Sequence, residues 1–350
     1  QTTQAIQAWD PKSGEAPGEA VYAALYADLK VAVKARNHTK VASRLNYETP
    51  GIASLFRKSG RRIKKMKDGN YKEQFLKMDK NWGKLFVWET IHRFSGPYTS
   101  GYFLSSVDAE KTSEGVSLKP EDERLYLYLL WRTMLLSVVI TITCVLLGYP
   151  IAYILADLPL RTSNLLMILV LLPFWTSLLV RTSSWIVLLQ EQGVINDFLV
   201  MLGIIDDQSR LALMYNETGT VIAMTHILLP FMILPLFSVM KTVSPSYMRA
   251  AKSLGASDWT AFWRVYFPNT IPGIGAGGVL VFILAIGYYI TPELVGGTSG
   301  IFISNRIAYH ISSSLNWGLG AALGVMLLGV VLVMYFIYDK IVGIDNVKLG

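Results

Sequence analysis

The stretch SPSYMRAAKSLGASDWTAFWRVYFPNTIPGI, residues 244–274, decides the fold class of this 350-residue chain. It is a polar, helix-forming segment between two long apolar runs. Ser244 can cap a helix that opens at Pro245, because proline fits the first helical turn. A second short helix is expected over residues 259–266, ending before Pro268, since proline disfavours the helical conformation for its predecessor. Small side chains leave a smooth face for a protein partner: Ala250, Ala251, Gly255 and Ala256.

Composition places the rest of the chain in a membrane. Hydrophobic residues make up 52% of the sequence and charged residues only 16%, which is too apolar for an ordinary soluble domain. The apolar residues form five runs near the length of about 20 residues that crosses a bilayer. The runs cover residues 131–155, 165–189, 221–240, 273–289 with the segment after it, and 319–341. Residues 1–125 are polar and are expected to be a soluble region.

The charges of the loops orient these runs by the positive-inside rule. The loop after the third run carries Lys241, Arg249, Lys252 and Arg264. The loop after the second run is acidic, with Glu191, Asp197, Asp206, Asp207 and Glu217 against Arg210. We therefore expect residues 244–274 and the C-terminus in the cytoplasm and residues 1–125 outside it. Carrying that region across a membrane requires a signal or a helix, so a sixth transmembrane helix is expected upstream.

The stretch 244–274 resembles the EAA loop of permease subunits of binding-protein-dependent ABC importers. The family pattern is Glu-Ala-Ala, three variable residues, Gly-Ala, then Phe/Val and Pro…Pro-Gly. The matching residues are Ala250, Ala251, Gly255, Ala256, Phe262, Val265, Pro268, Pro272 and Gly273. Arg249 stands where the family usually has glutamate, which puts an acidic contact in doubt but keeps the small-residue face. The resemblance implies a cytoplasmic coupling helix that docks on an ATPase through Arg249, Ala250, Ala251, Leu254, Gly255 and Ala256.

Four further segments resemble the first permease subunit of spermidine/putrescine importers. They are LPFWTSLLVR (172–181), GVINDFLVMLGIID (193–206), LLPFMILPL (228–236) and TPELVGG (291–297). The resemblance covers most of residues 125–345 and implies an all-α membrane protein of the bacterial inner membrane. Its fold would be a type I ABC importer transmembrane domain over residues 126–345, with residues 1–125 outside the resemblance.

The resemblance also implies partners and a solute. Such a permease pairs with a second homologous permease, two ATP-binding subunits that hold ATP and Mg²⁺, and a periplasmic solute-binding protein. The expected solute is a polyamine or a similar small cation. The alternative is an opine or an amino-acid derivative, because other members of that branch import these compounds.

Motifs for chemistry within the chain are absent from the sequence. It has no G-x-x-x-x-G-K-[ST] phosphate loop, so it is not expected to hydrolyse ATP, and it has no G-x-S-x-G or H-E-x-x-H motif. The histidines His38, His92, His226 and His310 are scattered, so no metal site is expected. We therefore expect a non-catalytic subunit without a cofactor of its own. A secondary transporter is the less favoured alternative, because it would need a coupling-ion site and internal repeats.

Ionisable residues at membrane depth are costly unless they face water or a partner, so they are candidates for the solute pathway. Arg181 lies inside the second run, either extending its charge toward the interface or facing a cavity. Glu293 lies near the outer end of the fourth run, where an acid beside aromatic rings suits a cation, or belongs to an interfacial aromatic belt. The seven pathway candidates are Arg181, Trp175, Trp185, Tyr288, Tyr289, Glu293 and Trp317.

The N-terminal third has its own pattern. Residues 20–35 and 42–67 are expected to be partly helical, and Trp82, Phe86, Trp88 and Phe94 are expected to form a small core. The densest run of positive charge falls within residues 57–67. It is either a solvated helix face or a docking surface for an acidic solute-binding protein, since complementary charge mainly speeds encounter. Nucleic-acid binding is not expected of a region outside the cell.

Overall fold

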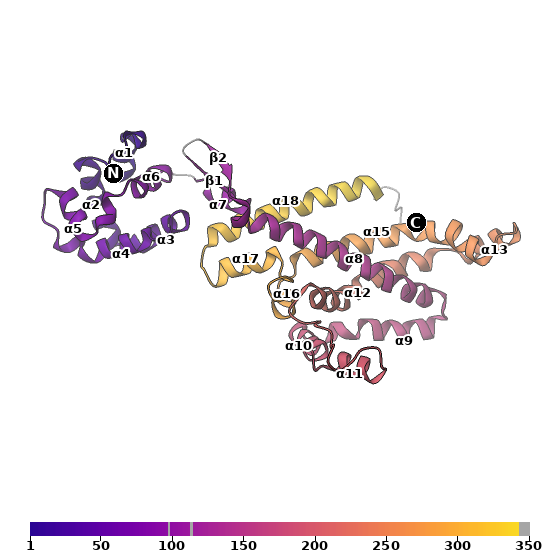
Figure 1. The fold of residues 1–350 in the computed structure, drawn as a ribbon. Helices are drawn as coiled ribbons and strands as arrows, with labels where there is room; N and C mark the ends of the chain where they lie inside the picture. The colour runs from indigo at the N-terminus through magenta and orange to yellow at the C-terminus, as the bar shows by residue number, and fades with distance from the viewer. Residues whose placement is uncertain (97–98, 113–114, 343–350) are drawn as a thin grey trace. The chain divides into compact units, whose positions relative to one another are not determined.

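The computed structural model describes residues 1–96, 99–112 and 115–342, and the chain divides into two compact units, Gln1–Gly101 and Tyr102–Gly350 (Figure 1). The first unit ends before residue 125, where the soluble region was expected to end. Residues after 101 belong to the second unit because Tyr102 packs against Leu129 and its neighbours, and Asp108 Oδ2 accepts the Leu127 N–H at 2.7 Å. Residues 343–345 of the expected transmembrane domain lie outside the described residues.

The first unit is a small helical bundle. Its helices are α1 (Thr2–Gln7), α2 (Glu19–Lys34), α3 (His38–Glu48), α4 (Ile52–Arg62), α5 (Tyr71–Met78) and α6 (Leu85–Arg93). The helical stretch expected over 42–67 is divided between α3 and α4. The division falls at Pro50 and Gly51, because Gly51 has a φ of +100°, a conformation that favours glycine.

The core of the first unit is built on two tryptophans. Trp82 and Trp88 are fully buried, as expected from the sequence, whereas Phe86 is 43% exposed and lies outside the core. The Trp82 carbonyl accepts hydrogen bonds from Tyr22 Oη and from Trp88 Nε1, each at 2.7 Å. Burial raises the pKa of Tyr22 to about 12. Tyr22 of α2 and Trp88 of α6 are therefore linked through the same buried carbonyl.

The second unit is mostly helical. A short antiparallel pair, β1 (Ala109–Lys111) and β2 (Val116–Leu118), follows α7 (Gly101–Ser106). The helices after it are α8 (Tyr126–Asp157), α9 (Leu160–Leu171), α10 (Leu178–Leu189), α11 (Val194–Met201), α12 (Glu217–Thr242), α13 (Pro245–Ser253), α14 (Asp258–Ala261), α15 (Phe267–Gly287), α16 (Ile290–Val295), α17 (Ile303–Ser312) and α18 (Trp317–Val342).

Four helical spans in the described residues are long and apolar enough to cross a membrane. They are Tyr126–Asp157, Glu217–Thr242, Asp258–Gly287 and Trp317–Tyr338, which confirms the first, third, fourth and fifth apolar runs. The second run differs from a straight span, because Leu160–Trp175 and Leu178–Met201 meet at a bend of 96°. This bent pair is either a broken span or a re-entrant loop.

Helices α8, α12 and α15 form the core of the second unit (Figure 1). Buried residues from all three helices meet there, among them Ile140, Met232 and Val281. Glycines on α8 and α15 allow the close approach: a Cβ added to Gly277 would lie 2.7 Å from Met232 Sδ. Small residues at such contacts are typical of helices packed in membranes.

Candidate functional site

Helix α13 is capped at both ends by the residues that predicted it. Ser244 Oγ accepts the Ser246 N–H at 3.3 Å, and Pro245 occupies the first turn. At the other end Gly255 has a φ of +90°. The Gly255 N–H donates to the Lys252 carbonyl at 2.9 Å and the Ala256 N–H to the Ala251 carbonyl at 3.1 Å, the paired bonds of a Schellman motif. A nine-residue helix thus begins and ends at fixed points.

The surface of α13 is open. None of its nine residues is buried, and Leu254, which follows its last turn, is 90% exposed. Trp259, on α14, is 72% exposed. Of the six residues expected to contact an ATPase, Arg249, Ala250, Leu254 and Gly255 are exposed and Ala251 and Ala256 are half-buried. Figure 1 shows α13 at one end of the α12–α15 pair, with α16 at the other end. Exposed Leu254 and Trp259 beside this open helix are of the kind of apolar surface that marks a protein interface.

The helix after α13 does not end before Pro268, so that expectation is wrong. It runs continuously over Asp258–Gly287. A five-residue π-helical turn, Phe262–Tyr266, lies immediately before the proline region. Proline in a helix clashes with the carbonyl four residues earlier and cannot donate a hydrogen bond, and a wider π turn accommodates both defects. Helix α14 is therefore continuous with the fourth span.

The bend in the second span lies beside Arg181. Pro173 lacks an N–H group, and the chain turns between Trp175 and Leu178. The Arg181 Nη2 donates to the Pro173 carbonyl and, at 3.1 Å, to the Thr176 carbonyl. These two carbonyls lie at the break. The Pro173 carbonyl also accepts the Thr176 N–H at 3.2 Å and the Thr176 hydroxyl at 2.8 Å, so the backbone group that the guanidinium alone satisfies here is the Thr176 carbonyl. Trp175, at the bend, is 89% exposed.

We expect Arg181→Met to destabilise this bend, because it removes a charged donor from two carbonyls. Hydrogen bonds to charged groups contribute about 1.5–3 kcal/mol. The melting temperature of the purified protein in detergent should fall relative to the wild type. Arg161→Met, at an exposed position of α9, is the matched control and should change it little. Equal melting temperatures for the two variants would show that the hydrogen bonds of Arg181 do not stabilise the bend.

Three of the expected pathway residues come together around α10 and α12. Trp185 Nε1 donates to His226 Nδ1 at 3.1 Å. The Arg181 charge lies close enough to act on both His226 and Tyr288. The buried hydroxyls of Thr182 and Thr291, 3.2 Å apart, tie α10 to α16. The structure thus places Arg181, Trp185 and Tyr288 in one neighbourhood, joined by threonines that the sequence did not single out.

Glu293 and Tyr289 are held by an asparagine on α17. Asn305 is 5% exposed, and its Nδ2 donates to Glu293 Oε2 at 2.6 Å and to the Tyr289 carbonyl at 2.9 Å. The Asn305 Oδ1 accepts the Phe302 N–H at 2.9 Å, which fixes the side chain at the start of α17. Glu293 itself is exposed, so its second oxygen is available to a ligand. A lone asparagine after an apolar stretch gave no signal of this role.

One of the expected pathway residues, Trp317, lies apart from this neighbourhood. Trp317, the first residue of α18, is 64% exposed. In the described part of the chain no hydrogen bond, ion pair or ring contact joins it to Arg181 or Glu293. Sequence reasoning also missed Arg132 of α8, which is 8% exposed and lies 5.2 Å from the Tyr128 ring centre. The sequence signal that could have identified Arg132 is a charged residue at the start of the first apolar run.

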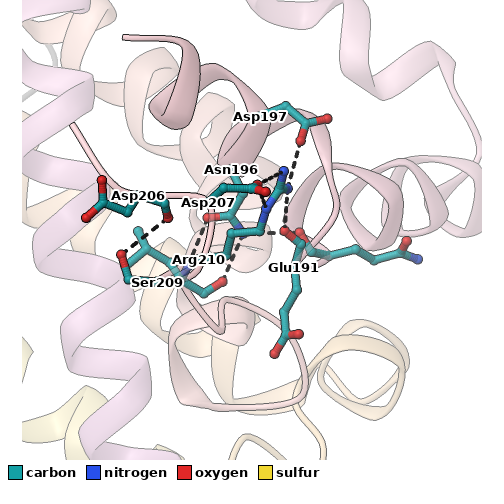
Figure 2. Close-up of polar contacts among 9 residues, drawn as sticks. Glu191, Asn196, Asp197, Asp206, Asp207, Ser209 and Arg210 are labelled. Carbon is teal, nitrogen blue, oxygen red and sulfur yellow. Dashed lines mark hydrogen bonds and ion pairs between the residues drawn. The ribbon is translucent and has the colours of Figure 1, made fainter. Parts of the chain in front are cut away.

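The acidic loop between α10 and α12 is organised by Arg210 (Figure 2). Its guanidinium pairs with Asp197 at 2.7 Å and with Asp207 at 2.8 Å, and it donates to the Glu191 carbonyl at 2.9 Å. Hydrogen bonds to Asp207 and Asp197 raise the pKa of Arg210. Asn196, fully buried, accepts the Leu211 N–H and returns a bond to its carbonyl. The one basic residue of the loop therefore has a structural role, and the loop keeps its acidic surface.

Residues 148–342 match the family of binding-protein-dependent transport system inner membrane components. The matched segment contains α13, the bend at Arg181 and the Glu293 neighbourhood.

Named relatives agree with this match. The spermidine/putrescine transport system permease protein PotB of Salmonella typhimurium strain LT2 is 36% identical over 226 residues, covering 65% of this chain and 78% of the relative. PotB of Escherichia coli K12 is 35% identical over 225 residues, covering 64% and 81%. The inner membrane ABC transporter permease protein YdcU of Escherichia coli K12 is 30% identical over 262 residues, covering 71% and 82%.

Solved structures share the fold at low identity. A bacterial ABC transporter involved in the import of alginate superposes with a TM-score of 0.55 at 17% identity, over 73% of this chain and 86% of that one. The alginate transporter in complex with its periplasmic protein gives a TM-score of 0.51, also at 17% identity, over 64% and 80%. These likenesses concern the arrangement of the helices alone.

Proposed function

The chain belongs to the family of binding-protein-dependent transport system inner membrane components, and we propose that it forms half of the pathway by which an ATP-driven importer moves a small polycation. As a family member it is a multi-pass permease subunit of the inner membrane. The observation that carries the proposal is α13: a short, doubly capped helix, open to solvent, linked by the four residues 254–257 to the span Asp258–Gly287.

The partners follow from what the chain lacks and what it presents. A second homologous permease would complete the pathway, and two ATP-binding subunits would hold ATP and Mg²⁺, so this chain would bear no cofactor and no catalytic group. One ATP-binding subunit would dock on Arg249, Ala250, Ala251, Leu254, Gly255 and Ala256. The α13 loop and the C-terminus would lie in the cytoplasm, and residues 1–125 in the periplasm.

Movement of the ATPases would reach the solute through one stiff element. A push on α13 acts on α14, which continues as a single helical span to Gly287. The start of α16 follows directly at Ile290, and α16 carries Glu293. A rigid helix transmits such a displacement because packed cores switch between arrangements instead of deforming gradually. The coupling helix α13 would therefore be linked mechanically to Glu293 on α16.

The solute class is inferred from the site and from the relatives. Glu293 offers an exposed carboxylate beside Tyr289, which is 46% exposed, and a carboxylate with aromatic faces attracts an ammonium group. Two relatives are named as spermidine/putrescine permeases. Arg181, the residue that would favour an opine or an amino-acid derivative, already donates to two backbone carbonyls. These observations favour a polyamine, with the carboxylate-bearing solutes as the second candidate.

Uptake by cells that lack their own polyamine importers tests the proposal. The chain, co-expressed with its partner permease, ATPase and binding protein, should take up radiolabelled putrescine or spermidine, and ATPase inactivation should stop it. Uptake of a radiolabelled opine instead, with no putrescine transport, would overturn the solute class. Failure of the chain to co-purify with an ATP-binding subunit would overturn the permease assignment in favour of a secondary transporter.

Glu293→Gln is expected to weaken polyamine transport without lowering the amount of protein. One lost charge interaction near water is worth about 1 kcal/mol, which is roughly a fivefold rise in KM. Glutamine keeps the side chain's length and an oxygen for Asn305. Glu121→Gln, on an exposed 3₁₀ turn before α8, serves as the control and should leave KM unchanged. Unchanged uptake kinetics for Glu293→Gln would remove this residue from the pathway.

A further inference from the structure

The positive charge of the chain is concentrated in the first unit. Residues 1–101 contain 18 Lys and Arg residues against 9 Asp and Glu, whereas residues 102–350 contain 14 against 16. The charge is densest on α4 and on the 3₁₀ turn Ile63–Lys65 that continues it. Seven basic side chains follow one another there without an acid, and all are exposed: Arg57, Lys58, Arg61, Arg62, Lys64, Lys65 and Lys67. These seven residues are called the basic face below.

Helix α4 separates the basic face from the core of the unit. Its other side carries buried apolar residues, among them Ile52, Leu55 and Phe56. Arg57 and Arg61 are four residues apart, as are Lys58 and Arg62, so the members of each pair are neighbours on the helix surface. Like charges at this spacing destabilise a helix. The core contacts hold α4 in place despite this repulsion, which a negatively charged surface would offset.

Few of these charges are neutralised within the chain. Lys58 pairs with Asp79 at 2.8 Å, and this contact lowers the pKa of the Asp79 carboxyl. No other residue of the basic face takes part in an ion pair among the described residues. Lys84 also lies close enough to lower the pKa of Asp79, so the positive region extends to the start of α6. Beside it the Phe86 ring is 43% exposed, with its centre 5.9 Å from Lys84 Nζ.

A bilayer surface suits the basic face better than a second protein does. Phospholipid headgroups present a dense layer of charge and need no complementary shape, so they match a stripe of long cations along one helix. Residues 102–125 connect the first unit to the membrane span that begins at Tyr126, which keeps the effective concentration of headgroups around the unit high. An exposed aromatic ring beside basic residues, as at Phe86, is typical of segments that lie at a membrane surface.

We propose that the basic face binds the headgroups of anionic phospholipids. Its lysine and arginine side chains lie against the phosphates, and Phe86 contacts the apolar layer beneath them. The contact holds the first unit at the bilayer and is separate from the solute pathway. Because it is electrostatic, it depends on the fraction of anionic lipid and is weakened by salt.

Fluorescence quenching of the full chain in lipid nanodiscs tests this. A bimane label on Ser54→Cys reports the basic face, because Ser54 is exposed and precedes Arg57 by three residues on the same side of α4. Gln7→Cys, exposed at the end of α1, is the matched control, since α1 packs on α2 and α6 and lies across the unit from α4 (Figure 1). Cys144 is buried and should not take the label. The discs contain a lipid with a spin-labelled headgroup in phosphatidylcholine, either alone or with about 30% phosphatidylglycerol.

We expect phosphatidylglycerol to increase the quenching of the Ser54→Cys label about threefold or more, and that of the Gln7→Cys label little. About 0.5 M NaCl, which shortens the Debye length to about 4 Å, should remove the increase. Arg61→Gln with Lys65→Gln should lower the increase by about half or more. Lys119→Gln with Arg161→Gln removes the same charge from the second unit and should leave it unchanged. The melting temperature of each variant checks its fold.

Three results would each overturn the proposal. The first is no increase in quenching with phosphatidylglycerol, and the second is an equal increase at Gln7→Cys. The third is an increase that survives the loss of Arg61 and Lys65. A Ser54→Cys label that responds to an acidic solute-binding protein, and not to phosphatidylglycerol, would assign the basic face to a protein partner instead.

Discussion

Gly255→Trp is expected to abolish transport while the chain remains folded in the membrane. Gly255 has a φ of +90°, so any other residue there is strained by about 1–2 kcal/mol. That cost is small against the typical stability of about 5–15 kcal/mol of a folded protein. A Cβ at this position meets no atom within 4 Å among the described residues, so the indole would project outward. It would occupy the space into which the ATPase must fit.

The control for this variant separates strain from obstruction. Asparagine tolerates the left-handed conformation better than other residues with a side chain, and it is small. Gly255→Asn should therefore keep most of the uptake that Gly255→Trp loses. Both variants should reach the membrane in wild-type amounts. Normal uptake by Gly255→Trp would show that α13 is not the surface on which the ATPase docks.

Gly300→Val is expected to remove the protein from the membrane. A Cβ at Gly300 would lie 2.5 Å from the Gly296 Cα, a backbone atom that cannot move aside cheaply. The Gly300 N–H donates to the Gly296 carbonyl at 2.7 Å, and its own carbonyl accepts the Thr220 hydroxyl at 3.1 Å. Overpacking of this kind costs about 3 kcal/mol or more where the backbone is held on both sides. Because these contacts fix α16 to α12, the Glu293 neighbourhood should be lost with them.

The measurement is the amount of properly inserted protein and its melting temperature. Gly324→Val is the matched control, since a Cβ at Gly324 on α18 meets no described atom within 4 Å. That variant should resemble the wild type. If Gly300→Val accumulates and melts like Gly324→Val, the close packing of α16 on α12 is not required for the fold.

The parts of the fold that follow local rules could be predicted from the sequence. The serine–proline start and the glycine end of α13 are local signals, because capping involves residues within one turn of the helix end. Apolar runs of spanning length are also visible without tertiary information. The four continuous spans confirm them. The family resemblance rested on the same segments and was confirmed by the match over residues 148–342.

Features that depend on contacts between distant residues could not be predicted. The 96° bend follows from Pro173 together with a guanidinium eight residues later, and hydropathy alone does not distinguish it from a straight span. The passage of a helix through Pro268 depends on a π turn that no propensity scale encodes. Asn305 reaches Glu293 across a loop, so its role appears only once α16 and α17 are in place.

Photo-crosslinking from Leu254 tests the central claim most directly. Leu254 replaced by p-benzoylphenylalanine would present its reactive group from a position that is 90% exposed. In membranes holding the assembled transporter, we predict a light-dependent adduct with the ATP-binding subunit. Leu146, on α8, is 68% exposed and should give no such adduct when replaced in the same way. Absence of the adduct from Leu254, or an equal yield from Leu146, would contradict the docking of an ATPase on α13.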